Sequence, residues 1–390
     1  MPPAMAATSH NASPAGGDLW IANSVSDLIQ GDVREHLPIE RIPLHGDVLG
    51  MGTTTSIDNG ELAFLQDGDA DTTIWKCQSS DGGIRALKPG DGSANFPYVC
   101  FSGDARGLRT PVQLDRLGPS EGRPLQELVG EAIELMVGRG ELAAAPVYGL
   151  RLVAHWEQLI ITVASKLCMG QQRRNTTVAS SAASAATAQR SIYELLQHYR
   201  LSPEDPGHWD DPIRYLGRSL HWDCCGFWDS EPQLGRVTVP VEGAHLHVHG
   251  CSTDLRHGGH LHHEHPQTRL KQLERLVLYP MQRVHQLGSD LAIEDLHYAQ
   301  GSVRFRVCNK GTMDVSDVGV AVVIDNAYDT HRYLRLPWLN AGDQEEFSLD
   351  LNLEPGRHRL EVIADPERDI LEEARTQSNN RQVLDLESPG

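Results

Sequence analysis

The sequence predicts a first region of mixed α and β structure, followed by an all-β sandwich. Short apolar runs beside Asp-Gly and Asn-Gly turns in residues 60–102 indicate β-hairpins. Apolar residues over 124–138 lie mostly on one face of a helix. In the last hundred residues, short alternating apolar runs recur with turn residues between them, which is typical of an antiparallel sandwich.

The remaining elements follow in chain order. Residues 147–165 have strand character, 192–200 predict a second, shorter helix, and 220–280 are again strand-like. Residues 281–288 are expected to be a connector.

These elements predict the domain organisation. Residues 1–17 are rich in Ala, Ser, Pro and Gly, and we expect them to form a disordered tail. A first domain is expected over 18–286 and a second over 287–390.

The composition is that of a globular protein and excludes several functional classes. The chain has 390 residues, of which 39 % are hydrophobic and 22 % are charged. Its net charge of −19 argues against nucleic acid and anionic membranes as partners. Apolar runs long enough to span a membrane are absent from the sequence. The seven cysteines show no CxxC spacing, so we expect reduced thiols in a cytoplasmic protein.

A His-Leu-His sequence followed by a Gly-Gly-His sequence predicts a metal site. Side chains at i and i+2 of a strand point to the same face, so His245 and His247 can present two imidazoles side by side. His260 on a neighbouring strand completes a set of three, which leaves coordination positions open as in a catalytic site. Further histidines crowd the same segment, and a solvated histidine-rich loop is the alternative.

This segment resembles the metal-binding segment of α-acetolactate decarboxylases. The matching residues are Gly226-Phe227-Trp228, Val239-Pro240, His245-Leu246-His247 and Gly258-Gly259-His260. Upstream, the run from His45-Gly46-Asp47 to Thr53 and the sequence Gly60-Glu61-Leu62 are similar to two further motifs of the family. The order of the motifs is preserved, and the resemblance covers residues 19–280.

The resemblance implies a fold, a cofactor and a reaction. The fold is α/β (α+β) with mixed sheets, and the cofactor is zinc or another divalent transition metal on His245, His247 and His260. The reaction is that of a carbon–carbon lyase, as in acetoin biosynthesis, in which a 2-hydroxy-3-keto acid loses CO₂ through a metal-stabilised enediolate. Glu61 is then the catalytic acid and Thr53 a substrate-binding residue.

Three departures from the family pattern concern the site. The loop between His247 and the Gly-Gly-His sequence is about two residues longer than in the family. The family arginine that holds the substrate carboxylate falls on Thr162 in an ungapped alignment, whereas a short insertion brings Lys166 there as the catalytic cation. Lysine cannot form the two-pronged contact of arginine. An acidic residue that the family supplies from its C-terminal tail has no match here.

The C-terminal region resembles the CARDB type of immunoglobulin-like module, which implies an interaction domain. The matching residues are Asp290-Leu291, Val307–Thr312, Asn340-Ala341-Gly342, Gly356-Arg357-His358, Ala364-Asp365-Pro366, Ile370–Glu373 and Asn379-Asn380. The Asn-Lys-Gly and Asn-Ala-Gly sequences are turns, and Asp-Pro ends a strand.

Three functions remain open at this point. The first is the lyase, with a small keto acid as substrate. The second is a metal-dependent isomerase or cyclase of specialised metabolism, which uses the same enolate chemistry without decarboxylation. The third is a non-catalytic metal- or ligand-binding protein, against which the presence of Glu61 argues. A homodimer and a protein partner of the C-terminal module are also left open.

Overall fold

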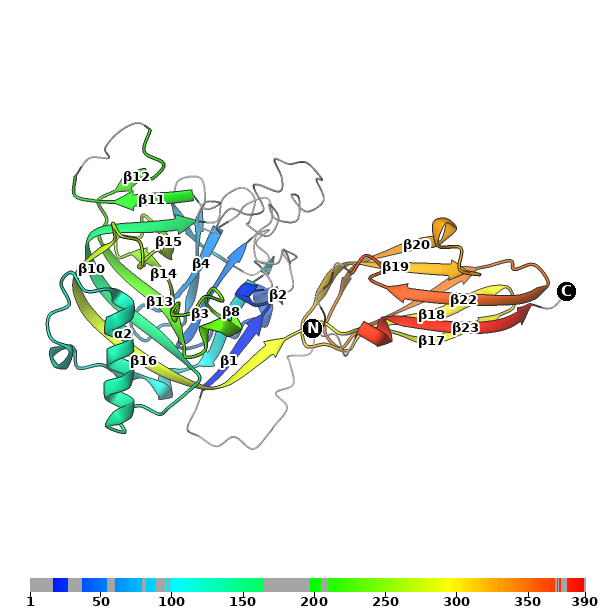
Figure 1. Cartoon of the computed structure of the whole chain (residues 1–390), viewed down its shortest axis with the longest axis horizontal. Helices are drawn as coiled ribbons and strands as arrows, with labels where there is room; N and C mark the ends of the chain where they lie inside the picture. Colours follow the sequence, from blue (N-terminus) through cyan, green and yellow to red (C-terminus); the bar gives the residue numbers. More distant parts are fainter. Residues whose placement is uncertain are drawn as a thin grey trace. The chain divides into compact units, whose positions relative to one another are not determined.

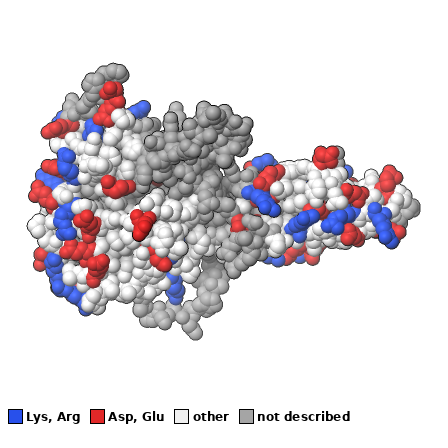
Figure 2. Space-filling model, viewed as in Figure 1, with Lys and Arg blue, Asp and Glu red and all other residues white. Residues whose placement is uncertain are grey.

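The structure is a computed structural model that divides into two compact units, with the boundary between Gln286 and Leu287. It describes residues 17–26, 37–54, 60–78, 82–88, 95–96, 98–163, 197–204, 210–368, 370, 372 and 377–388. None of the helices in these ranges has the length and apolar character needed to span a bilayer. On the face shown in Figure 2, acidic and basic side chains are interspersed over both units.

The first unit is built on one 14-stranded sheet, with the order β13-β14-β15-β10-β16-β1-β8-β3-β4-β5-β6 (Figure 1). Strands β9, β11 and β12 join it beside this path. The strands are β1 (Gly17–Ala22), β3 (Val48–Thr54), β4 (Gly60–Leu65), β5 (Thr73–Gln78), β6 (Ile84–Ala86), β8 (Tyr98–Asp104), β9 (Thr110–Pro111), β10 (Val147–Val163), β11 (Gln197–Leu201), β12 (Arg214–Gly217), β13 (His221–Asp229), β14 (Leu246–Ser252), β15 (Gly258–Leu261) and β16 (Arg269–Leu287). A separate pair joins β2 (Leu37–Pro38) to β7 (Asn95–Phe96).

The expected α+β character is confirmed only in part, because the first unit is mostly β-sheet. Among the described residues, α2 (Leu125–Gly138) is the one α-helix seen from end to end, and it confirms the helix predicted over 124–138. Of the strand pairings that the described residues form, β11 with β12 is parallel and the others are antiparallel. Short 3-10 helices lie at Ile39–Arg41, Arg106–Leu108, Leu114–Leu117, Pro232–Leu234, Tyr328–Thr330 and Gln377–Asn380.

Helix α2 covers one side of the long strand β10 (Figure 1). Its buried residues are Leu125, Leu128, Val129, Ala132, Ile133 and Met136, and they share a core with Leu150 and Leu152 of β10. Gly130 permits close approach here, since a Cβ at this position would lie 2.8 Å from the Trp228 ring. The helix forms because its apolar stripe is buried against the sheet, which contributes more to helix stability than local propensity does.

Two predicted elements differ from the structure. The helix predicted over 192–200 is wrong where it is described, because residues 197–201 form β11 and pair with Leu159–Val163 of β10. A short segment is a marginal helix, and pairing with a long strand satisfies its backbone instead. The connector predicted over 281–288 is the end of β16, which continues to Leu287 beside β1. By contrast, the strand predicted from residue 147 is confirmed as β10.

The second unit is an antiparallel sandwich of a three-stranded and a four-stranded sheet, in the orders β17-β18-β21 and β20-β19-β22-β23. The strands are β17 (Leu291–Ala299), β18 (Ser302–Asn309), β19 (Val315–Ile324), β20 (Arg332–Leu339), β21 (Gln344–Asp350), β22 (Gly356–Ala364) and β23 (Arg381–Ser388). Alternating apolar residues of both sheets, such as Phe305 and Val320, fill the core. The predicted all-β sandwich is confirmed.

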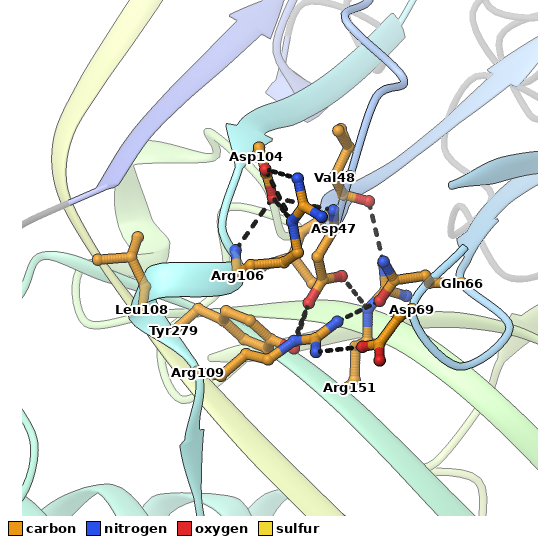
Figure 3. A network of polar contacts seen from close by, with 12 residues as sticks. Asp47, Val48, Gln66, Asp69, Asp104, Arg106, Leu108, Arg109, Arg151 and Tyr279 are labelled. Carbon is orange, nitrogen blue, oxygen red and sulfur yellow. Dashed lines mark hydrogen bonds and ion pairs between the residues drawn. The ribbon is translucent and has the colours of Figure 1, made fainter. Parts of the chain in front are cut away.

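A buried ionic network joins the start of β3 to the middle of the sheet (Figure 3). The Asp47 carboxylate, which has no exposed surface, accepts hydrogen bonds from Arg109 Nε at 2.6 Å, Arg151 Nε at 2.7 Å and the Tyr279 hydroxyl at 2.8 Å. Burial by itself would raise the pKa of Asp47, but these partners bring it below its usual value. The carboxylate is therefore ionised and connects β3 to β10 and β16.

Candidate metal centre

Three histidines meet where β14, β15 and β10 lie side by side. His249 of β14 pairs directly with His260 of β15, and His247 lies two residues before His249 on the same face. One ring nitrogen of each of the three lies within 4.8 Å of the others. The Gly-Gly sequence before His260 makes this approach feasible, since a Cβ at Gly259 would lie 2.9 Å from the Thr162 carbonyl oxygen.

Backbone carbonyls orient two of these rings toward each other. His247 Nδ1 donates to the Val237 carbonyl at 2.5 Å, and His249 Nδ1 donates to the Leu62 carbonyl at 2.8 Å. Each neutral ring then carries its proton on Nδ1, which leaves Nε2 with a lone pair. The two Nε2 atoms are 3.1 Å apart. Lone pairs that face each other at this distance repel, and a cation between them removes the repulsion, so the donor set fits a divalent transition metal.

The electrostatic surroundings keep all three rings neutral. Burial lowers the pKa of His247 to about 4. Burial, and then the neighbouring His247, hold the pKa of His249 well below its usual value, and burial and the surrounding histidines do the same for the pKa of His260. Only neutral imidazole binds a metal ion, so the site is ready for binding at neutral pH.

His245, the first of the three predicted ligands, lies outside this cluster. Strand β14 begins after it, at Leu246, and its Nδ1 lies 2.7 Å from the Asp229 carbonyl oxygen. Its ring stacks on Trp228 with the ring centroids 4.9 Å apart. The structure therefore brings together His247 and His260 of the predicted set and adds His249.

A signal for His249 was present in the sequence. The predicted set made the loop before the Gly-Gly-His sequence two residues longer than the family pattern. Moving the pair of ligands by two residues, from His245 and His247 to His247 and His249, removes this excess. The alternation of a strand permits either pair, so spacing within the His-x-His-x-His run did not distinguish them.

Glu61 and Thr53 lie on the neighbouring hairpin of β3 and β4, where they face each other across the strands. The Glu61 side chain is 11 % exposed, and its Oε2 lies 3.8 Å from His249 Nε2. The Thr53 hydroxyl donates to the Gly60 carbonyl at 3.0 Å and thereby holds the hairpin beside Glu61. The structure thus brings the predicted glutamate to the histidine cluster, whereas the Thr53 hydroxyl proton is used within the hairpin.

The two alternatives for the family arginine have different outcomes. Thr162 pairs directly with His260, is fully buried, and has a hydroxyl with no hydrogen-bond partner in the described part of the chain. Cross-strand partners share a face, so this hydroxyl lies next to the cluster. Lys166 lies outside the described residues.

Comparison with known proteins gives one family-model match and several matches to solved structures. A family model described as CARDB matches residues 292–383. The X-ray structure of α-acetolactate decarboxylase from Bacillus subtilis strain 168 aligns at 12 % identity with a TM-score of 0.43, over 69 % of this chain and 88 % of that chain. A Staphylococcus aureus protein of unknown function, described as similar to α-acetolactate decarboxylase, aligns at 14 % identity with a TM-score of 0.41 and the same coverage.

A solved CARDB domain of a Pyrococcus furiosus protein, in complex with di-metal ions, aligns at 18 % identity with a TM-score of 0.21, over 26 % of this chain and 93 % of that chain. A search of curated protein sequences found no match. The family model confirms the CARDB resemblance in the second unit, and the chain is similar to acetolactate decarboxylases at low identity.

Proposed function

We propose that the first unit is a metal-dependent lyase that acts on a small 2-hydroxy-3-keto acid. The observation that carries the proposal is the facing of the His247 and His249 Nε2 lone pairs at 3.1 Å, with the Glu61 carboxyl beside them. These two histidines and His260 would hold a divalent ion, for which zinc is our first choice. When bound, it would supply a Lewis acid that draws electron density from the oxygens of the substrate.

Glu61 is suited to donate the proton that this reaction requires. Loss of CO₂ leaves an electron pair on the α-carbon, and one proton must be added there to complete the product. The Glu61 carboxyl approaches the site from one hairpin only, so a proton held on Oε2 reaches one face of the substrate. Exchange with water then restores the proton on Glu61.

A second candidate function is favoured by Thr162. A decarboxylase needs a group that holds the substrate carboxylate, and a cation does this best because an unpaired buried charge is costly. The residue opposite His260 is the neutral Thr162, and Arg151 of the same strand is bound to Asp47. A hydroxyl suits a keto or hydroxyl oxygen of the substrate, which supports an isomerase or cyclase that retains its carbon atoms.

Product analysis distinguishes the two functions. Chelator-treated protein is incubated with acetolactate before and after zinc is restored, and CO₂, acetoin and isomerised acid are measured. The lyase predicts zinc-dependent CO₂ and acetoin, with a loss of about 100-fold or more in Glu61→Gln because a positioned acid contributes that much. Glu157→Gln on the exposed face of β10 is the matched control and should retain activity. An isomerised acid without CO₂ supports the second candidate, and zinc binding without any conversion contradicts both for this substrate.

A further inference from the structure

A second group of metal-ligand side chains lies on β10, β13 and β16, and it shares no residue with the histidine cluster described above. Among the residues that the structure describes, His155, His221 and Glu274 place one ligand atom each within 4.8 Å of one another. His155 Nε2 lies 2.9 Å from Glu274 Oε1, and His221 Nε2 lies 3.0 Å from Glu274 Oε2. One carboxylate therefore faces two imidazole nitrogens.

The backbone is shaped to bring Glu274 to these rings. His155 and His221 are direct partners in the antiparallel pairing of β10 with β13. On the other side of β10, Val153 pairs with Arg275 and Ala154 pairs with Leu273, so Glu274 is the extra residue of a β-bulge. A bulge redirects a side chain and disrupts the hydrogen-bond ladder locally, and such bulges are frequent beside functional sites.

Thr253 occupies one nitrogen of His221 and leaves the other to Glu274. The Thr253 hydroxyl oxygen lies 3.1 Å from His221 Nδ1 and 3.4 Å from the His221 carbonyl oxygen, and His221 Nε2 lies 3.0 Å from a carboxylate oxygen. When the hydroxyl donates to Nδ1, the neutral ring donates its Nε2–H to the carboxylate; when the hydroxyl accepts from Nδ1, Nε2 carries the lone pair that binds a metal ion. The contact with Glu274 therefore accommodates either a proton on Nε2 or a metal ion.

The two rings lie side by side and both turn Nε2 to the same carboxylate. The His155 and His221 rings are parallel, with centroids 3.9 Å apart and planes 7° apart. Two neutral rings can each donate an Nε2–H to the carboxylate, and a divalent ion would replace these two protons once the rings turn out of their parallel stack, because an imidazole binds a metal within its ring plane. The adjacent Arg275 is turned to Asp223, at 3.4 Å, and not to Glu274.

We propose that His155, His221 and Glu274 form a second divalent transition-metal site, distinct from the candidate metal centre. Two imidazoles and a carboxylate are a donor set that suits zinc, nickel or copper. The side chains are 39 %, 35 % and 34 % exposed, so solvent water completes the coordination. The ion connects three neighbouring strands, and its binding therefore stabilises the first unit.

Zinc stoichiometry tests the proposal on the full chain. Chelator-treated protein is dialysed against zinc, and bound metal is measured by elemental analysis. The wild type should bind about two ions per chain, and His155→Ala, His221→Ala and Glu274→Gln about one each. His285→Ala is the matched control, because His285 forms an exposed pair with Asp18 at 2.6 Å and belongs to neither cluster. It should retain about two ions.

Electron paramagnetic resonance of bound copper identifies the ligands of the second site independently of the candidate metal centre. The His249→Ala variant disables the candidate metal centre, and the electron paramagnetic resonance spectrum of Cu²⁺ bound to it should show coupling to two imidazole nitrogens. In the double variant His249→Ala with His155→Ala, coupling to one imidazole nitrogen should remain. Retention of two zinc ions in His155→Ala with normal circular dichroism, or copper without nitrogen coupling, overturns the proposal. Failure here leaves the proposed function untouched, since that function depends on the other histidines.

Discussion

Replacing Asp47 by asparagine is the sharpest test of how the first unit is held together. The substitution nearly preserves shape, but it removes the negative charge that three donors contact in Figure 3 and turns one acceptor oxygen into an amide donor. Arg151 is then left with its charge buried, because its side chain is 6 % exposed. Its remaining partners are the carbonyl oxygens of Phe64 at 2.8 Å and Val48 at 3.0 Å, which are neutral.

The magnitude follows from which partner stays buried. Breaking a buried pair costs about 3–5 kcal/mol when the remaining charge is uncompensated. The Arg109 side chain is 32 % exposed, so solvent screens its charge and its contribution to the loss of stability is small. The two carbonyls that still accept from Arg151 reduce the loss somewhat. We therefore expect Asp47→Asn to lower the free energy of unfolding by about 3–4 kcal/mol.

Guanidinium unfolding followed by tryptophan fluorescence measures this loss. Six of the seven tryptophans precede residue 287, so the signal reports the first unit. The control is Asp18→Asn, whose carboxylate forms an exposed pair with Arg283 at 2.6 Å and should cost less than about 1 kcal/mol. The double variant Asp47→Asn with Arg151→Met should recover part of the stability. A loss below about 1 kcal/mol, or no recovery in the double variant, would refute the reasoning.

Three further predictions concern the candidate metal centre and the domain boundary. The folded-state pKa of His247 is about 4 against an unfolded value of 6.5, so this residue by itself should stabilise the metal-free protein fully above pH 6.5 and cost about 3 kcal/mol as the pH falls toward 4. The lowered pKa values of His249 and His260 act in the same direction, and thermal unfolding across this pH range measures the combined loss of stability. By elemental analysis, the His249→Ala variant should bind about one zinc ion per chain fewer than the wild type, whereas His245→Ala should bind as much as the wild type. Loss of zinc in His245→Ala but not in His249→Ala would instead support His245, His247 and His260 as the ligands. A chain that ends at residue 287 should fold and retain its metal, because β16 is then complete; insolubility that the second unit relieves would contradict this.

Sequence patterns predicted the elements whose burial has a regular period. Helix α2 appeared within one residue of its predicted start because its apolar stripe repeats at helical spacing. Strand β10 and the C-terminal sandwich appeared because their apolar residues come in runs typical of strands. The segment 192–200 lacked enough length for its pattern to be decisive, and pairing with β10 made residues 197–201 a strand.

For the site, the sequence determined the residue types and their neighbourhood, and the tertiary structure decided which of them meet. The alternating histidines and the Gly-Gly-His sequence predicted a cluster of imidazoles, but His245 and His249 were equivalent by period. Strand β14 begins at Leu246, and its register with β15 places His249 opposite His260. The group of His155, His221 and Glu274 had no sequence signal at all, because its members are far apart in the chain and a bulge in β16 joins them. Period-two patterns specify faces, whereas register and bulges are set by long-range pairing, which no local pattern contains.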